Sequence, residues 1–211
     1  MLNNNRAKRN LFLLFITAVF GWLTVITPVQ AAPSGDPVSL LKYIADNMID
    51  GLKANKATLK TKPSIVYNLA YKYVVPYASL NEMSKRVLPP RIWNSATDAQ
   101  KKEFQKLFTT TVIRTYASAL TNYQDQTIKF FPMRSGASGN TVEVSSQIIS
   151  SQSQPINVTY RLVRTSGGWK LYDMSVEGVS MLSSFRAQFS DILGNGDMDS
   201  LLNKLSGHNS R

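Results

Sequence analysis

The chain has no cysteine and a single histidine, His208, among its 211 residues. Without cysteine it can form no disulfide, thiolate centre or iron–sulfur site, and its amino terminus cannot carry a lipid on a cysteine. One histidine near the carboxyl terminus cannot share a metal with a second imidazole or act as the base of a serine triad. The sequence therefore predicts no metal site and no cofactor, and a fold held together by its hydrophobic core.

Acidic residues are also scarce, with 13 of them against 24 lysine and arginine residues. They show no spacing that indicates a glycosidase pair, and the sequence contains no phosphate-binding glycine loop and no serine–lysine motif. We therefore expect a binding protein and not an enzyme. A small enzyme that acts on a lipid or a sugar is the alternative, in which Asp173 or Glu177 would be the essential acid.

The excess of basic residues gives a net charge of +11 at pH 7. Loss of the amino-terminal segment described next would remove three basic and no acidic residues and lower the net charge to +8. Such an excess is typical of proteins that meet anionic lipid head groups or acidic partner surfaces, and equally of a basic surface that is simply solvated.

The only long hydrophobic run lies at the amino terminus. Three basic residues precede Leu11–Leu23, a run of about 13 residues, whereas a membrane span needs roughly 20. A Thr-Pro pair ends the run, and the following Val-Gln-Ala places small residues at the −3 and −1 positions of a cleavage site. We predict a cleavable signal peptide at residues 1–31, one domain at residues 32–205, a flexible tail at residues 206–211 and a periplasmic location.

Helical periodicity dominates the first half of the domain. Asp36-Pro37 is typical of a helix start, and apolar residues recur at helical spacing after it. Further helices are predicted from Pro63 to Pro76 and over Asn81–Leu88. The clearest helix begins at the capping box Thr97-Asp98-Ala99-Gln100 and carries a wide apolar stripe.

From Gln126 the apolar period changes from 3.6 to 2 residues, which predicts strands. Short turns separate them, so we expect an antiparallel meander with one apolar and one polar face. Helices before the strands and a helix after them predict an α+β fold. The four expected strands are QTIKFFPM, TVEVSSQIIS, PINVTYRLVRT and WKLYDMSV.

The last of these strands is apolar on both sides. As a regular strand, WKLYDMSV places Trp169 and Leu171 on one face and Tyr172, Met174 and Val176 on the other. The Glu-Gly pair that follows predicts a turn into the last long helix.

This segment also resembles a known family. Tyr172-Asp173-Met174, followed by Glu177-Gly178-Val179-Ser180, is similar to the W-x-x-Y-D-M … E-G-V-S pattern of the MlaC family of periplasmic phospholipid carriers, also grouped as toluene-tolerance auxiliary proteins. The segments 74–88 and 94–132 follow the family's pattern as well, so the resemblance covers most of residues 38–205. The chain departs from it near Ser79, where many members have an aspartate, and at Pro89-Pro90, where they have a glycine.

The resemblance implies a non-enzymatic carrier whose cargo is a phospholipid. Such a carrier would shuttle lipids between an outer-membrane lipoprotein complex and an inner-membrane ABC transporter complex that includes an MCE-domain protein, and so maintain outer-membrane lipid asymmetry. We expect it to be a monomer that binds no nucleic acid. A ligand-free module that docks on a membrane-anchored partner is the alternative.

The resemblance also implies where the lipid lies. The family fold is a twisted antiparallel sheet wrapped on one face by several helices, loosely like nuclear transport factor 2, with an apolar cavity between the layers. For each apolar side chain taken singly, a filled core is the simpler interpretation, and the resemblance is what favours a hollow. The head group would stay in solvent near Arg161, Arg164 or Lys129. The predicted tail pocket consists of Val74, Met83, Val87, Phe108, Val112, Tyr116, Phe130, Val144, Ile148, Val158, Tyr160, Leu162, Tyr172, Met174, Val176, Val179, Met181 and Phe185.

Overall fold

The computed structural model of the chain describes residues 35–133, 139–151, 153–194 and 196–209. All of these residues belong to one unit, Ala32–Arg211, and the predicted signal peptide lies outside them. Within these ranges no helix combines the length and the apolar character that crossing a bilayer requires.

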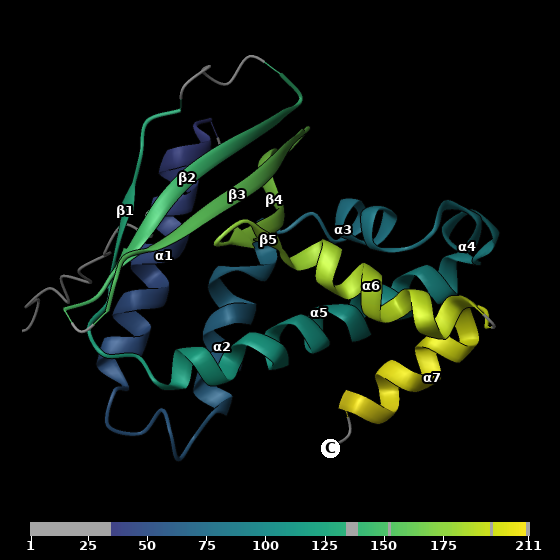
Figure 1. Cartoon of the computed structure of the whole chain (residues 1–211), viewed down its shortest axis with the longest axis horizontal. Coiled ribbons are helices and arrows are strands. Elements are labelled where there is room, and N and C mark those ends of the chain that lie inside the picture. The colour runs from purple at the N-terminus through teal and green to yellow at the C-terminus, as the bar shows by residue number, and fades with distance from the viewer. Residues whose placement is uncertain (1–34, 134–138, 152, 195, 210–211) are drawn as a thin grey trace, which may run out of the picture. The chain divides into compact units, whose positions relative to one another are not determined.

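The described residues form an α+β fold in which helices precede and follow one sheet (Figure 1). The helices are α1 Pro37–Ala54, α2 Ser64–Tyr73, α3 Leu80–Val87, α4 Pro90–Ser95, α5 Asp98–Thr121, α6 Met181–Gly194 and α7 Met198–Asn209, with a 3₁₀ turn, η1, at Val75–Tyr77. The strands are β1 Thr127–Phe130, β2 Thr141–Ile149, β3 Ile156–Thr165, β4 Gly168–Val176 and β5 Val179–Ser180.

Both helix starts that the sequence indicated most clearly are confirmed. The Asp36 carboxylate accepts a hydrogen bond from the Ser39 amide at 2.7 Å at the start of α1. At the start of α5, the Gln100 amide donates to Thr97 Oγ1 at 3.2 Å and the Thr97 amide donates to Gln100 Oε1 at 2.9 Å. These bonds pair amide groups that a helix start otherwise leaves without partners.

The sheet is an antiparallel meander in the order β1-β2-β3-β4-β5. The meander was predicted, whereas the two-residue strand β5 was not. The register confirms the two faces: Val144 lies opposite Tyr160 on the apolar face, and Glu143 lies opposite Arg161 on the polar face.

Strand β4 contains a bulge that changes the predicted assignment of its side chains. Asp173 pairs with Arg161, but Leu171 pairs with Leu162, so Tyr172 is an extra residue without a partner on β3. Side chains alternate along a regular strand, and one extra residue reverses the alternation beyond it. The prediction that Met174 and Val176 face away from Leu171 is therefore wrong, because all three share the apolar face. Of the apolar residues predicted on the opposite face from Leu171, only Tyr172 lies off the apolar face.

Apolar side chains of the described residues gather in three clusters. The sheet cluster lies between α1 and the sheet and contains Leu40, Ile44 and Val144. The helical cluster is built by α3 to α7 and is centred on Phe104 and Phe108. The third cluster joins the end of α1 to α2 and α5. The sheet is thus covered by α1, while the later helices build a core of their own (Figure 1).

Helix α4 was not predicted, and α7 is longer than the one or two turns that its apolar residues indicated. Pro90 is the first residue of α4, where its missing N–H costs no hydrogen bond. Helix α7 continues to Asn209, whose side-chain amide donates to the Leu107 carbonyl at 3.0 Å, while Arg114 donates to the Asn209 carbonyl at 2.6 Å. Residues 206–209, expected in a flexible tail, are therefore helical and attached to α5.

Candidate functional site

A buried carboxylate joins the sheet to α6. Asp173 is only 4% exposed. It accepts hydrogen bonds from Arg161 at 2.8 Å, from the Ser180 hydroxyl at 2.7 Å and from the Leu182 amide at 3.1 Å. The Leu182 bond pairs an amide in the first turn of α6, and the Arg161 bond compensates the charge.

The neighbouring Glu177-Gly178 pair forms the turn between β4 and β5. Both residues have positive φ, +48° and +81°, which is the backbone conformation of a tight primed hairpin turn. The Glu177 carboxylate accepts a hydrogen bond from the Asn157 amide on β3. The motif that carries the family resemblance therefore connects the sheet to α6 through hydrogen bonds and a tight turn.

All three head-group candidates contact other groups of the protein. Arg161 forms ion pairs with Glu143 at 2.7 Å and with Asp173 at 2.8 Å. The hydrogen bond to Glu143 is the largest influence that raises the pKa of Arg161, and Asp173 adds to it, whereas burial acts in the opposite direction. The Arg164 guanidinium lies over the Trp169 ring, 4.5 Å from its centroid. Lys129 is exposed on β1, and its ammonium group lies over the Phe131 ring, 5.7 Å from the ring centroid.

Many of the predicted tail-pocket residues lie inside the helical cluster. Aromatic rings pack closely there: the Phe108 ring centroid is 5.4 Å from that of Phe104 and 5.2 Å from that of Phe185. Side chains in such contact fill the space that a ligand would need. The predicted residues in or against this cluster are Met83, Val87, Phe108, Val112, Tyr116, Tyr172, Met181 and Phe185.

A second group of predicted residues belongs to the sheet cluster under α1. Its members are Val74, Phe130, Val144, Tyr160 and Leu162. Val179 lies apart from both groups, because it is the first residue of β5 and is 65% exposed.

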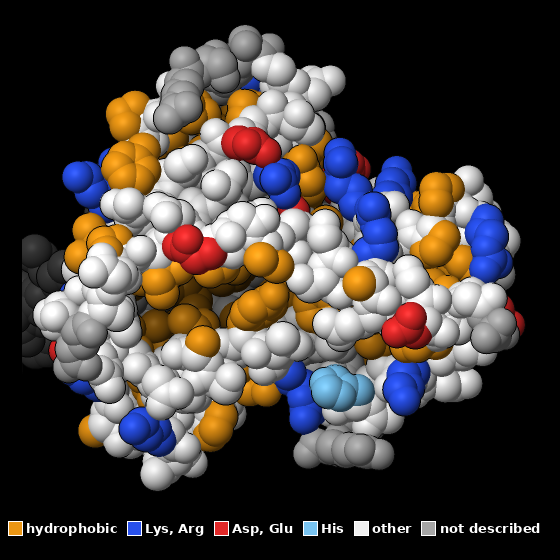
Figure 2. All heavy atoms as spheres, viewed as in Figure 1, with side chains coloured by type: hydrophobic (Ala, Val, Ile, Leu, Met, Phe, Trp, Pro, Cys, Tyr) orange, Lys and Arg blue, Asp and Glu red, His pale blue; other side chains and the backbone are white. Residues whose placement is uncertain are grey.

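The remaining predicted residues lie on the apolar sheet face outside all three clusters. They are Ile148, Val158, Met174 and Val176. Val158 pairs with Val176, and Val176 pairs with Val179 on β5. Figure 2 shows a hollow lined by hydrophobic side chains that lies, in the view of Figure 1, between β5 and α5. Of these four side chains Val158 is buried, at 1% exposed, whereas Ile148, Met174 and Val176 are half-buried.

Two hydroxyl groups interrupt this apolar face. Ser146 is 2% exposed and lies between Phe130 and Val158 in the register. Its hydroxyl hydrogen-bonds to the Tyr160 hydroxyl at 3.3 Å. Burial raises the pKa of Tyr160, which indicates apolar surroundings. Ser146 was not among the residues expected from the sequence, although a serine in an apolar register of TVEVSSQII is a visible signal.

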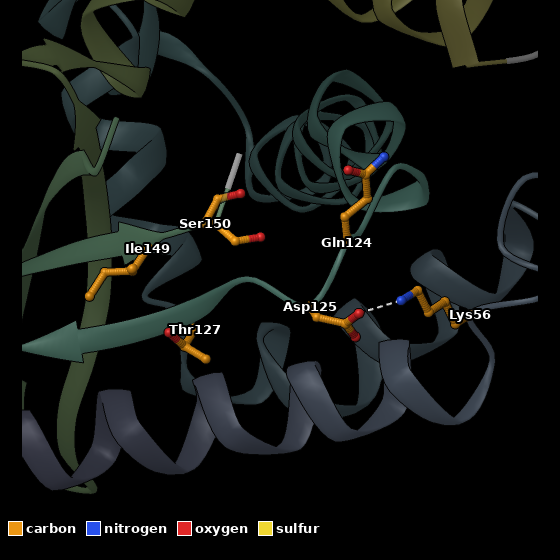
Figure 3. A pocket seen from close by; sticks show the side chains of 7 residues that line it. Lys56, Gln124, Asp125, Thr127, Ile149 and Ser150 are labelled. Atoms are coloured by element: carbon orange, nitrogen blue, oxygen red, sulfur yellow. Dashed lines mark hydrogen bonds and ion pairs between the residues drawn. The ribbon is translucent and has the colours of Figure 1, made fainter. Parts of the chain in front are cut away.

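A separate, open pocket of about 610 Å³ lies beside the loop between α5 and β1 (Figure 3). Lys56 and Asp125 form an ion pair at this pocket. Thr127 pairs with Ile149 there, and alternation places both on the polar face of the sheet. A mostly polar lining on that face does not suit hydrocarbon. The pocket is lined by Lys56, Gln124, Asp125, Thr127, Ile149, Ser150 and Ser151.

Comparison with known proteins agrees with the fold and the motif. The model of the family described as MlaC protein matches residues 42–207. The chain is 28% identical to the intermembrane phospholipid transport system binding protein MlaC of Haemophilus influenzae, over 87% of this chain and 91% of that protein. It is 25% identical to the toluene tolerance protein ttg2D of Pseudomonas putida, over 92% and 88% of the two chains.

A solved structure shares the architecture as well. The phospholipid-binding protein from Ralstonia solanacearum, solved in complex with a phospholipid, superposes with a TM-score of 0.74 at 27% identity, over 81% of this chain and 94% of that one. The family model spans well over half of the sequence, and the predicted motif, sheet and helices are all present. The protein belongs to the MlaC family.

Proposed function

We propose that this protein is a periplasmic phospholipid carrier that holds the acyl tails of its cargo in the hollow between the apolar sheet face and α5. Two observations carry the proposal: a hollow lined by hydrophobic side chains (Figure 2), and three half-buried apolar side chains of the sheet face that belong to none of the clusters, Ile148, Met174 and Val176. The names of the relatives and of the structural neighbour support a phospholipid as the ligand.

The size of the hydrophobic effect explains why a carrier needs such a hollow. Each methylene taken from an apolar setting into water costs about 0.8 kcal/mol, and a two-tailed phospholipid has roughly 30 of them. Exposure of the tails would therefore cost on the order of 20 kcal/mol. A shallow groove on the surface cannot provide that much shielding.

The same arithmetic limits what the carrier does by itself. Tails that move from a bilayer into an apolar hollow exchange one hydrocarbon environment for another, so the net change in free energy is small. We therefore propose that docking partners set the direction. These would be an outer-membrane lipoprotein complex and an inner-membrane ABC transporter complex with an MCE-domain protein.

Within this proposal the tail pocket is narrower than the sequence suggested. We assign tail contacts to Ile148, Met174 and Val176, which lie outside the filled clusters. The aromatic residues of the helical cluster act as scaffold. Arg161 already has two carboxylate partners, so we do not assign it to the head group.

The test is the identity of what copurifies. The full chain is expressed with export to the periplasm, purified without detergent, washed extensively and extracted with organic solvent, and the extract is analysed by mass spectrometry. We expect close to one phospholipid per protein. Protein that yields no phospholipid, and binds none when lipid is added, would contradict the carrier and favour a ligand-free docking module.

A further inference from the structure

The Ser146 and Tyr160 hydroxyl groups form a polar pair on the otherwise apolar face of the sheet. Tyr160 lies opposite Val144 on β2 and Met174 on β4. Its hydroxyl reaches Ser146, which belongs to the next row of side chains across the sheet. That row continues through the buried Val158 to Val176, which is half-buried.

The two hydroxyl groups have more hydrogen-bonding capacity than they use. Each can donate one hydrogen bond, and the bond between them consumes only one of the two hydrogens. Among the described residues, neither hydroxyl has another hydrogen-bond partner. A hydroxyl hydrogen without an acceptor in apolar surroundings carries an unmet desolvation cost. The pair is therefore ready to donate to a ligand.

The surroundings restrict what that ligand group is. No cationic side chain takes part in the pair, and an isolated charge in apolar surroundings is expensive, so a phosphate does not fit here. A neutral carbonyl oxygen fits. The last pair of apolar residues at this end of the sheet is Ile148 and Ile156. Ser146 lies two residues before Ile148 on β2, which corresponds to about 7 Å along the strand. A phospholipid has its ester groups at such a depth, between the head group outside and the tails inside.

We propose that Ser146 and Tyr160 together bind an ester carbonyl of the phospholipid and so fix how deeply it enters the hollow. This inference rests on the proposed function. It assigns a specificity to the hollow: lipids with ester-linked tails bind more tightly than lipids with ether-linked tails, which lack the carbonyl.

The experiment is a competition between two lipids that differ only in this group. Delipidated full-length protein is mixed with equal amounts of diacyl and dialkyl phosphatidylethanolamine of the same chain length, and the protein-bound lipid is quantified by mass spectrometry. We expect the wild-type protein to retain the ester lipid about fivefold in excess, as one net hydrogen bond of typical strength predicts. A ratio close to one in the wild-type protein would overturn the proposal.

Variants assign the preference to the hydroxyl pair. Because either hydroxyl can donate when the other is missing, Ser146→Ala and Tyr160→Phe should each reduce the ratio only in part. The double variant should bring it close to one. Tyr71→Phe is the matched control, since it removes a hydroxyl that is exposed on α2 and bonded to Thr110, and it should keep the wild-type ratio.

The outcomes separate this inference from the proposed function. If the wild-type protein binds neither lipid, the carrier proposal fails. If it binds both and the double variant keeps the ester preference, the carrier proposal stands and the hydroxyl assignment fails. Thermal unfolding of each variant establishes that it is folded, and if the double variant does not fold, the single variants decide, because an unchanged ratio in both would overturn the assignment.

Discussion

At the scale of single residues, Asp173 shows how one side chain holds two layers together. Its carboxylate receives donors from β3, from β5 and from the first turn of α6. Glu143 contacts the same arginine but lies on the exposed polar face, with 61% of its side chain accessible. The two acids therefore share a partner and differ in burial, which makes them a natural pair for comparison.

We predict that Asp173→Ala lowers the free energy of unfolding by about 2–4 kcal/mol, because it leaves the Leu182 amide and one side of Arg161 without an acceptor. Glu143→Ala should cost less than about 1 kcal/mol, since exposed ion pairs contribute little. Urea denaturation measures both values. Equal losses in the two variants would show that the buried hydrogen bonds of Asp173 contribute no more to stability than the exposed ion pair of Glu143.

At the scale of elements, the turn between β4 and β5 sets the path from sheet to helix. Gly178 has φ +81°, and a Cβ placed on it would meet no neighbouring atom. Gly207 lies inside α7, and a Cβ there would also meet none. The two glycines thus differ in backbone conformation and not in available space.

From this difference we expect opposite effects of the same substitution. Gly178→Ala should destabilise the protein by about 1 kcal/mol, because L residues disfavour positive φ. Gly207→Ala should stabilise it by roughly 0.5–1 kcal/mol through helix propensity. Thermal or urea unfolding distinguishes the signs. A gain in stability from Gly178→Ala would mean that the turn does not keep this conformation in solution.

At the scale of the whole molecule, the proposed function depends on which apolar surface of the sheet is open to a ligand. Ile148 and Ile149 are neighbours on β2, and alternation places them on opposite faces. Ile148 pairs with Ile128 and Ile156 on the apolar face. Ile149 pairs with Thr127 and lines the polar pocket.

We predict that Ile148→Trp reduces the amount of copurified phospholipid several-fold, because the larger side chain occupies the hollow. Ile149→Trp adds the same volume one residue further along and should leave lipid content unchanged. Lipid per protein is measured by extraction and mass spectrometry, with circular dichroism as the check on folding. If Ile149→Trp were the damaging variant, the tails would lie on the other face of the sheet.

Much of the fold follows from local signals. The caps at Asp36 and Thr97, the alternation in β2 and β3, and the short turns are all encoded within a few residues, and the structure confirms each of them. Alternation could not reveal the extra residue at Tyr172, because a bulge is defined only against the partner strand. The same holds for α7, whose last turn is secured by contacts with α5.

The order of the elements, the two faces of the sheet and the family motif could be predicted without the structure, because they depend on residue type and spacing. Which apolar side chains pack into a cluster and which remain outside depends on contacts that exist only in the folded chain. An isoleucine or a valine has the same hydrophobicity in either place, and its neighbours come from segments far away in the chain. For that reason Phe108 is part of a filled core, whereas Ile148 lies outside every cluster.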